Sequence, residues 1–302
     1  MAIGASRIFH INANCSDLER SLTFYRDLVG LAPSTHTVPD PQPGAAFGLE
    51  TAQWDAWILT GARGFDGVAL DLLEWKTPRP SGHAYEHPAH LGLARLGFTT
   101  RDLDARHARL RDGGADCFGP PHDVEVDGDV VARAFVAADP DGVLIEFTGG
   151  EVDELAFVVV HCSDLDRSIE FYRDVVGLSV RYRLAPQRQD GTPLRITGEV
   201  EWESAVLGGP SGNGPFTVML VTWTQPRVLD PPAPEANQLG LYRLAMLTDD
   251  IDRDYDELRS HGARCMSGPA ELDMGPGLPS LRALLFNDPD GTTLELIESP
   301  AP

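Results

Sequence analysis

Three histidines, His83, His87 and His90, lie close enough together in the sequence to suggest a metal centre, because imidazole is a common metal ligand. Their spacing matches no standard helical metal site. The serine, glycine and proline residues around them are typical of an exposed turn. We therefore interpret this stretch, which begins at Pro78, as a solvated connector.

The four cysteines are the other side chains that could bind a metal. Cys15 and Cys162 occupy equivalent positions of an internal repeat, as do Cys117 and Cys265, but no CxxC pair or matching histidine spacing accompanies them. A zinc site is therefore not predicted. We interpret the cysteines as reduced residues that pack inside the protein.

The elements that must position any site are organised around one segment that occurs twice. CSDLERSLTFYRDLVGL at residues 15–31 returns as CSDLDRSIEFYRDVVGL at residues 162–178. Ser16 followed by Glu19 predicts the start of a helix, because such a pair satisfies free backbone N–H groups. Apolar side chains at helical spacing predict one buried face, and Gly30 predicts the end of the helix.

The composition limits the domain count and the partners. A chain of 302 residues with 42% hydrophobic content can form one large core or two ordinary ones, and the repeat at half-length favours two domains, residues 1–150 and 151–302. The net charge of −22 repels nucleic acids and anionic lipids. No apolar run approaches the roughly 18 residues that span a bilayer. We expect a cytoplasmic protein without a nucleic-acid or membrane partner.

Strand and helix patterns divide each half of the chain into two similar units. The first unit begins with a strand over residues 6–14 and the repeated helix, and three strand-like segments follow at 46–49, 55–59 and 68–75. The same order recurs more faintly after residue 93, and both units return after residue 155. The sequence therefore predicts an α+β fold of four βαβββ units.

Two motifs resemble those of the vicinal oxygen chelate superfamily. They are the helix S-D-L-x-R-S-x-x-F-Y-R-D-x-x-G-L and the turn and strand D-P-D-G-x-x-x-E. That superfamily includes glyoxalase I, the extradiol dioxygenases, and the fosfomycin and bleomycin resistance proteins. The resemblance implies two glyoxalase-like domains whose curled mixed sheets form cups, a polar cup in residues 1–150 and a more apolar one in 151–302. It implies much less about the reaction, because one scaffold hosts many chemistries.

The resemblance also implies where metal ligands would stand. The ligand of the family's first strand, usually histidine, precedes the Asp that opens the helix by seven residues. The four units place these residues there: His10, Arg95, Phe157 and Arg243. The ligand of the last strand, usually glutamate, follows the turn glycine by four residues. The equivalent residues are Asp71, Glu146, Met219 and Glu295, with Met219 placed by alignment of the neighbouring strand.

Two pairings of the units remain open at this point. If neighbours in sequence pair, the polar cup holds His10, Asp71, Arg95 and Glu146. If the first unit pairs with the fourth, it holds His10, Asp71, Arg243 and Glu295. Either pairing leaves one cup polar and the other half apolar.

Arginine replaces histidine in the second and fourth units while an acid is kept opposite. Because an Arg–carboxylate pair needs no ion to neutralise the acid, we expect no cofactor. The alternative is divalent iron, zinc, manganese or magnesium bound by His10, Asp71 and Glu146. A lone strand histidine is often a hydrogen-bonded core residue, and the matching Phe157 shows that the position tolerates an apolar side chain.

A catalytic set and a ligand-binding set follow. We predict that His10, beside a carboxylate, removes a proton next to a carbonyl while Arg95 holds the oxyanion. The predicted catalytic residues are His10, Asp71, Arg95 and Glu146. Trp75 and Trp223 share the strand parity of the inward positions and form either core or an aromatic wall for a flat ligand. The predicted ligand-binding residues are Trp75, Phe157, Met219, Trp223, Arg243 and Glu295.

Two classes of function remain. The favoured one is a lyase, isomerase or cyclase that acts on a carbonyl, phenolic or polyketide-like compound, and the other is a drug- or metabolite-binding protein. A metal-dependent glyoxalase or dioxygenase is a further alternative. Phe157 and Arg243 replace both histidines of the second half, which argues against ring cleavage. The expected partner is a hydrophobic small molecule, with a homodimer left open.

Overall fold

The computed structural model describes residues 2–85, 87–126, 128–209, 214–232 and 235–299. The first unit consists of β1 (Ala5–Asn14), α1 (Leu18–Thr23), a π-helical turn (Phe24–Val29), β2 (Ala32–Thr37), β3 (Gln42–Pro43), β4 (Thr51–Thr60) and β5 (Ala69–Thr77). The second consists of β6 (Gly92–Thr100), α2 (Leu103–Asp112), β7 (Asp116–Cys117), β8 (His122–Val126), β9 (Asp129–Ala138) and β10 (Leu144–Gly149).

The other half repeats this order. The third unit consists of β11 (Glu154–His161), α3 (Leu165–Glu170), a π-helical turn (Phe171–Val175), β12 (Ser179–Asp190), β13 (Glu199–Gly208) and β14 (Thr217–Gln225). The fourth consists of β15 (Gly240–Thr248), α4 (Ile251–Ser260), β16 (Arg264–Cys265), β17 (Ala270–Leu272), β18 (Leu281–Asn287) and β19 (Thr293–Glu298). The predicted α+β fold of four units is confirmed.

The predicted strand positions in the first unit are partly wrong. The segment predicted as a strand at 46–49 overlaps a 3-10 turn, and β2 lies instead in the Pro-rich stretch before it. Pro33 is tolerated because β2 is at the edge of its sheet, where a missing N–H removes no bond to a second neighbour.

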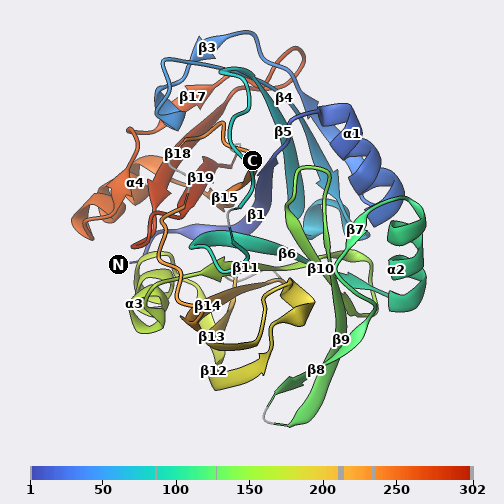
Figure 1. Cartoon of the computed structure of the whole chain (residues 1–302). Helices are drawn as coiled ribbons and strands as arrows, with labels where there is room; N and C mark the ends of the chain where they lie inside the picture. The colour runs from blue at the N-terminus through green and yellow to red at the C-terminus, as the bar shows by residue number, and fades with distance from the viewer. Residues whose placement is uncertain (1, 86, 127, 210–213, 233–234, 300–302) are drawn as a thin grey trace.

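The described strands form two mixed sheets, each built from both halves of the chain (Figure 1). The first sheet has the order β16-β18-β19-β15-β1-β5-β4-β2, so its blue and red strands join the first unit to the fourth. The second has the order β12-β13-β14-β11-β6-β10-β9-β7, which joins the second unit to the third. A polar cup made from residues 1–150 alone is therefore not formed. The boundary between the two domains stays a prediction.

An antiparallel pair of first strands lies at the centre of each sheet. β1 pairs with β15, with His10 opposite Ala245, and β6 pairs with β11 in the same way. The last strand of each unit flanks this pair in parallel, as β5 does with β1 and β19 does with β15. Four inward-facing positions from two units therefore come together at the centre of each sheet.

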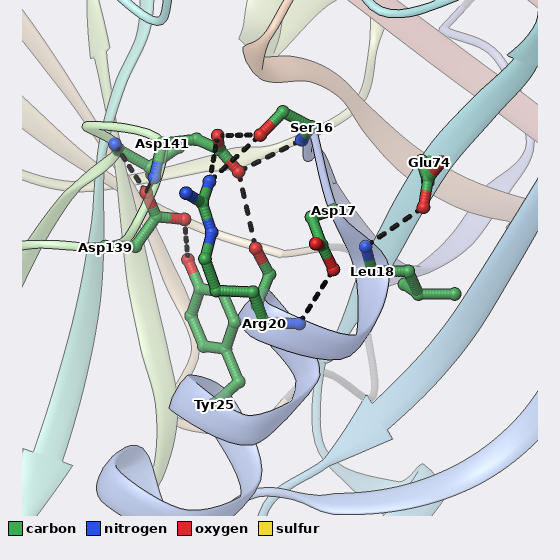
Figure 2. Close-up of polar contacts among 10 residues, drawn as sticks. Ser16, Asp17, Leu18, Arg20, Tyr25, Glu74, Asp139 and Asp141 are labelled. Carbon is green, nitrogen blue, oxygen red and sulfur yellow. Dashed lines mark hydrogen bonds and ion pairs between the residues drawn. The ribbon is translucent and has the colours of Figure 1, made fainter.

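The start of α1 is held by contacts that differ from the predicted capping pair (Figure 2). Asp17, and not Ser16, is the N-cap, and its carboxylate accepts from the Arg20 backbone N–H at 3.0 Å. Ser16 Oγ instead donates to Asp141 at 2.6 Å, and Arg20 Nη2 donates to the same carboxylate at 2.6 Å. The repeated motif therefore binds a neighbouring unit as well as starting a helix.

These contacts link α1 to the Asp-Pro-Asp-Gly turn of the second unit. The Tyr25 hydroxyl donates to the buried Asp139 carboxylate at 2.9 Å, beside the Asp141 contacts (Figure 2). The same cluster recurs between α3 and the fourth unit, where Ser163 Oγ donates to Asp290 at 2.6 Å. The clusters join units that are neighbours in sequence, whereas the sheets join the others, so contacts run around all four units.

The cysteines behave as predicted for packed thiols. All four are free, and Cys15 and Cys162 are buried in the main hydrophobic core. Burial raises the pKa of the Cys162 thiol to about 11, so it stays protonated at neutral pH. Within the described part of the chain, no helix is both long and apolar enough to cross a membrane.

Candidate functional site

Four buried polar side chains meet at the centre of the first sheet. His10, Asp71, Arg243 and Glu295 come from the adjacent strands β1, β5, β15 and β19. Each is at most 5% exposed. They line a cavity of about 610 Å³, which we call the polar pocket. Burying this many ionisable groups is costly unless they neutralise one another, which makes their arrangement informative.

The Arg243 guanidinium bridges the two carboxylates. Its Nε lies 2.7 Å from Glu295 Oε2, and its Nη2 lies 2.8 Å from Asp71 Oδ2. Burial by itself would lower the pKa of Arg243, but the charges of Glu295 and Asp71 outweigh it and raise the pKa. Burial would likewise raise the pKa of Glu295, yet Arg243 and His10 lower it to about 2. Arg243 and Glu295 are therefore charged at neutral pH.

His10 lies beside both carboxylates. Its Nε2 is 3.4 Å from Glu295 Oε2 and 3.7 Å from Asp71 Oδ2. Neither ring nitrogen has a well-formed hydrogen bond within the described residues, and the same is true of the buried Nη1 of Arg243. Two carboxylates against one guanidinium leave one negative charge uncompensated, directly beside the imidazole. The imidazole of His10 therefore faces the side of the cluster where acidic groups are in excess.

Asn12 is a site residue that the sequence analysis missed. Its Nδ2 donates to the side chain of Asp71 at 3.1 Å and to the backbone oxygen of Asp71 at 3.2 Å. It stands two residues after His10 on β1, so strand alternation places it on the same face and could have revealed it. Asn12 holds Asp71 in position against Arg243.

The walls of the polar pocket are mostly apolar. Phe47, Trp54, Ile58, Leu73 and Leu272 are among the residues that line it. Trp54 was not assigned to the site from the sequence. Its indole Nε1 donates to Thr37 Oγ1 at 3.0 Å, which orients the ring. An apolar cavity with a few convergent polar groups is the usual form of a small-molecule site.

The predicted role of Trp75 in ligand binding is wrong. Trp75 is fully buried and does not line the polar pocket. Its ring packs against Phe47 and Trp54, and its Nε1 donates to Asn14 Oδ1 at 3.2 Å. Strand parity places the side chain on the inward face, but these neighbouring rings cover it.

The predicted catalytic set is divided between the two sheets. Arg95 and Glu146 lie in the second sheet, where Arg95 Nε is 2.7 Å from Glu146 Oε2. They line a separate cavity of about 730 Å³ together with Phe157, Met219 and Trp223, which we call the aromatic pocket. The prediction that Arg95 and Glu146 act with His10 is therefore wrong. The β1–β15 pairing puts Arg243 and Glu295 there instead.

The family resemblance implies a divalent metal at these positions, and the donor set of the polar pocket does not fit one. The set predicted to bind it, His10, Asp71 and Glu146, is wrong because Glu146 is in the other sheet. Between Asp71 and Glu295 stands the Arg243 guanidinium, which carries a positive charge and has no lone pair to offer a metal. A metal would have to displace this ion pair. No group of three potential ligands is arranged for a metal within the described residues, the connector histidines included.

Two connector histidines, His87 and His90, are less exposed than predicted, whereas His83 is exposed. His90 packs against the ring of Tyr85 at 4.1 Å between centroids and against His161 at 6.2 Å. Burial lowers the pKa of His90 to about 4, so it is neutral at physiological pH. The connector is therefore part of the packed structure beside the aromatic pocket.

Comparison with known proteins agrees with this architecture. The lactoylglutathione lyase GLX1 of Arabidopsis thaliana is 22% identical over 301 residues, which is 97% of this chain and 92% of that protein. The uncharacterized protein YaeR of Escherichia coli K12 is 29% identical over 141 residues, 47% of this chain and 92% of its own length. The crystal structure of glyoxalase I from Zea mays has a TM-score of 0.68 at 18% identity, with 97% of this chain and 92% of that one covered.

A family model matches both halves of the chain. The matched residues are 7–147 and 154–296, which span the two pairs of units. The structural likeness to maize glyoxalase I shows that the fold is shared. With the two repeated motifs and the sheet order, these matches show that the chain belongs to the Glyoxalase/Bleomycin resistance protein/Dioxygenase superfamily.

Proposed function

We propose that the polar pocket is the active site of an enzyme that moves a proton on a small carbonyl or phenolic compound without a metal. The observation that carries this proposal is the Arg243 guanidinium, which bridges Asp71 and Glu295 and keeps Nη1 without a partner in the described structure. A fixed cation with an unused donor can stabilise an oxyanion. The reaction is of the lyase, isomerase or cyclase type.

His10 is the proton-transfer group in this proposal. Its Nε2 accepts the proton from a carbon next to the substrate carbonyl. The C–H electron pair forms the C=C bond of an enolate, and the π electron pair of the carbonyl moves onto its oxygen. Arg243 Nη1 donates to that oxygen. The imidazolium formed at His10 lies 3.4 Å from the Glu295 carboxylate. No oxidant or reductant is needed.

The fate of the enolate decides the class of reaction. Return of the proton from His10 to a different atom gives an isomer. Departure of a group from the neighbouring carbon gives a lyase product, and attack of the enolate carbon on a second carbonyl of the same molecule closes a ring. The likeness to proteins named lactoylglutathione lyase and glyoxalase I supports a reaction of the lyase type.

The volume and the lining of the polar pocket favour a largely apolar substrate. Its volume of about 610 Å³ is within the usual range for a drug-sized ligand. Trp54 and Phe47 offer flat apolar surfaces, while the charged groups gather in the central cluster and in the Arg282–Glu298 ion pair. A hydrophobic compound with one carbonyl directed at Arg243 matches this distribution.

Hydrogen–deuterium exchange tests the proposal with a panel of compounds, so that no single substrate has to be chosen. Aromatic ketones and polyketide-like carbonyl compounds are incubated with the protein in D₂O, and deuterium next to the carbonyl is followed by NMR. His10→Gln should slow exchange about 10²- to 10⁴-fold with little change in affinity. His36→Gln, at a histidine outside the pocket on β2, is the matched control and should exchange at the wild-type rate.

Two outcomes would overturn the proposal. One is tight binding of a panel compound that never exchanges or reacts, with His10→Gln binding it equally well. That result would identify a drug- or metabolite-binding protein. The other is exchange that requires a stoichiometric metal ion, which would show that Arg243 does not replace the cation.

A further inference from the structure

The aromatic pocket is a second cavity that the proposed reaction does not use. It measures about 730 Å³ and opens on the second sheet, between β6, β10, β11 and β14 on one side and the segments β8–β9 and β12–β13 on the other. It therefore has the size of a small-molecule site. Its chemistry differs from that of the polar pocket in three respects.

The first difference is the charge balance. Arg95 and Glu146 form a single ion pair with an Nε–Oε2 distance of 2.7 Å, and the third and fourth inward positions are Phe157 and Met219. One guanidinium faces one carboxylate, so the cluster has no net charge. An anionic ligand would lack a free counter-charge here, because the other charged lining residues are mostly acidic. The central cluster of the polar pocket, in contrast, has an excess carboxylate.

The second difference is a donor without an acceptor. Arg95 Nη1 is buried and has no hydrogen-bond partner within the described residues. A buried N–H that stays unpaired costs free energy, which a ligand oxygen would recover. Because Asp123, Glu125 and Asp190 outnumber Arg188 in the rest of the lining, the matching acceptor is an uncharged carbonyl oxygen and not a carboxylate.

The third difference is a histidine that cannot transfer a proton. Trp223 Nε1 can only donate, so the bond of 3.1 Å to His161 requires His161 Nε2 to be the acceptor. The proton of His161 is then on Nδ1, which donates to the His90 carbonyl at 2.9 Å. Burial, with smaller contributions from His90 and Arg95, holds the pKa of His161 well below its ordinary value. Both nitrogens are occupied, and the ring is neutral.

Aromatic side chains form the remaining walls. Trp202 and Trp223 line the pocket with Phe157, and Trp202 and Trp223 are 8% and 7% exposed. The bond to His161 fixes the orientation of the Trp223 ring. Flat apolar walls of this kind suit a planar aromatic ligand.

We propose that the aromatic pocket is a second ligand site, which binds a flat, uncharged aromatic ketone or quinone through its carbonyl oxygen to Arg95 without reacting with it. This inference does not rest on the proposed reaction, because none of its residues belongs to the polar pocket. The chain then binds a neutral compound in the aromatic pocket in addition to the substrate of the polar pocket.

The pair 9-fluorenone and fluorene tests the proposal, because the two planar compounds differ only in the carbonyl oxygen. Binding of each to the full chain is measured by isothermal titration calorimetry. Fluorenone should bind more tightly than fluorene, and Arg95→Met should remove that difference by weakening fluorenone binding about 10-fold, as expected for a hydrogen bond from a charged donor. The affinity for fluorene should stay the same.

Two further variants keep the test decisive. Arg95→Lys retains the positive charge near Glu146, so it can replace Arg95→Met in the test if Arg95→Met does not fold. It should show an intermediate preference for fluorenone. His10→Gln changes only the polar pocket and should leave the affinity for fluorenone unchanged. The proposal is wrong if Arg95→Met and wild type prefer fluorenone equally, if neither compound binds, or if His10→Gln removes the binding. The last result would place the ketone in the polar pocket and so leave the proposed reaction standing.

Discussion

Arg243→His should convert the polar pocket into a metal site. The substitution removes the guanidinium between Asp71 and Glu295 and adds an imidazole on β15, the strand that pairs with the His10 strand β1. Two carboxylates and two imidazoles are a ligand set that suits zinc or manganese. The wild-type chain already has three of these ligands, His10, Asp71 and Glu295, but they surround the Arg243 guanidinium instead of a metal.

The expected gain in affinity follows from the buried ion pair. A metal that enters the wild-type pocket must displace the Arg243 guanidinium, which is 5% exposed, and so break a buried ion pair at a cost of about 3–5 kcal/mol. Each 1.4 kcal/mol is about tenfold in affinity, so Arg243→His should bind zinc at least about 10²- to 10³-fold more tightly than wild type. The additional imidazole ligand increases this difference.

Calorimetric titration with zinc and elemental analysis after dialysis measure the effect. Without metal, Arg243→His should be less stable than wild type, because Asp71 and Glu295 lose their shared partner. Zinc at about 100 times its Kd should restore about 2.7 kcal/mol, seen as a higher melting temperature. This readout does not depend on activity.

Arg95→His is the matched control. It makes the same change at the equivalent position of the aromatic pocket, where Glu146 is accompanied by Phe157 and Met219. That pocket would offer one carboxylate and one new imidazole, too few for tight binding. Equal zinc affinity in both variants, or stoichiometric zinc in the wild-type protein, would refute the view that Arg243 replaces the cation.

Three further predictions concern stability. Burial raises the pKa of Asp139 to about 6, so the folded chain holds this proton more tightly than the unfolded chain and stability should fall as pH rises from about 4 to 6. Asp139→Asn should remove about 2 kcal/mol of the decrease between pH 4.5 and 7, measured by urea unfolding at these two pH values, and an unchanged pH dependence would contradict the assignment. Trp75→Phe leaves the buried Asn14 Oδ1 without its donor and should cost about 1–3 kcal/mol of unfolding free energy. The rate of substrate deuterium exchange should stay unaltered, and slower exchange would show that Trp75 belongs to the site. Asp141→Ala and Asp290→Ala should each cost about 1.5–3 kcal/mol in thermal unfolding, and a large effect of only one would show that the two clusters are not equivalent.

Local patterns in the sequence determined the units and the direction of their side chains. The repeated Ser-Asp-Leu segment and the Asp-Pro-Asp-Gly turns identified the family, which the match to residues 7–147 and 154–296 confirms. The family's spacing to the helix-opening Asp and to the turn glycine located His10 and Asp71. Strand alternation, which has a period of two and depends only on neighbouring residues, then relates the inward positions along one strand. Asn12 could have been found by the same rule.

Only the tertiary structure decided which inward residues meet. Alternation says that a side chain faces a cup but does not say which strand lies beside it, because strand pairing is a long-range choice made by the packing of whole units. The antiparallel pairing of β1 with β15 brings Arg243 to Asp71, and leaves Arg95 in the other sheet. Trp75 faces inward as predicted, yet the rings of Phe47 and Trp54 cover it. Distances between elements, and therefore the chemistry of the pocket, depend on contacts that local sequence spacing does not encode.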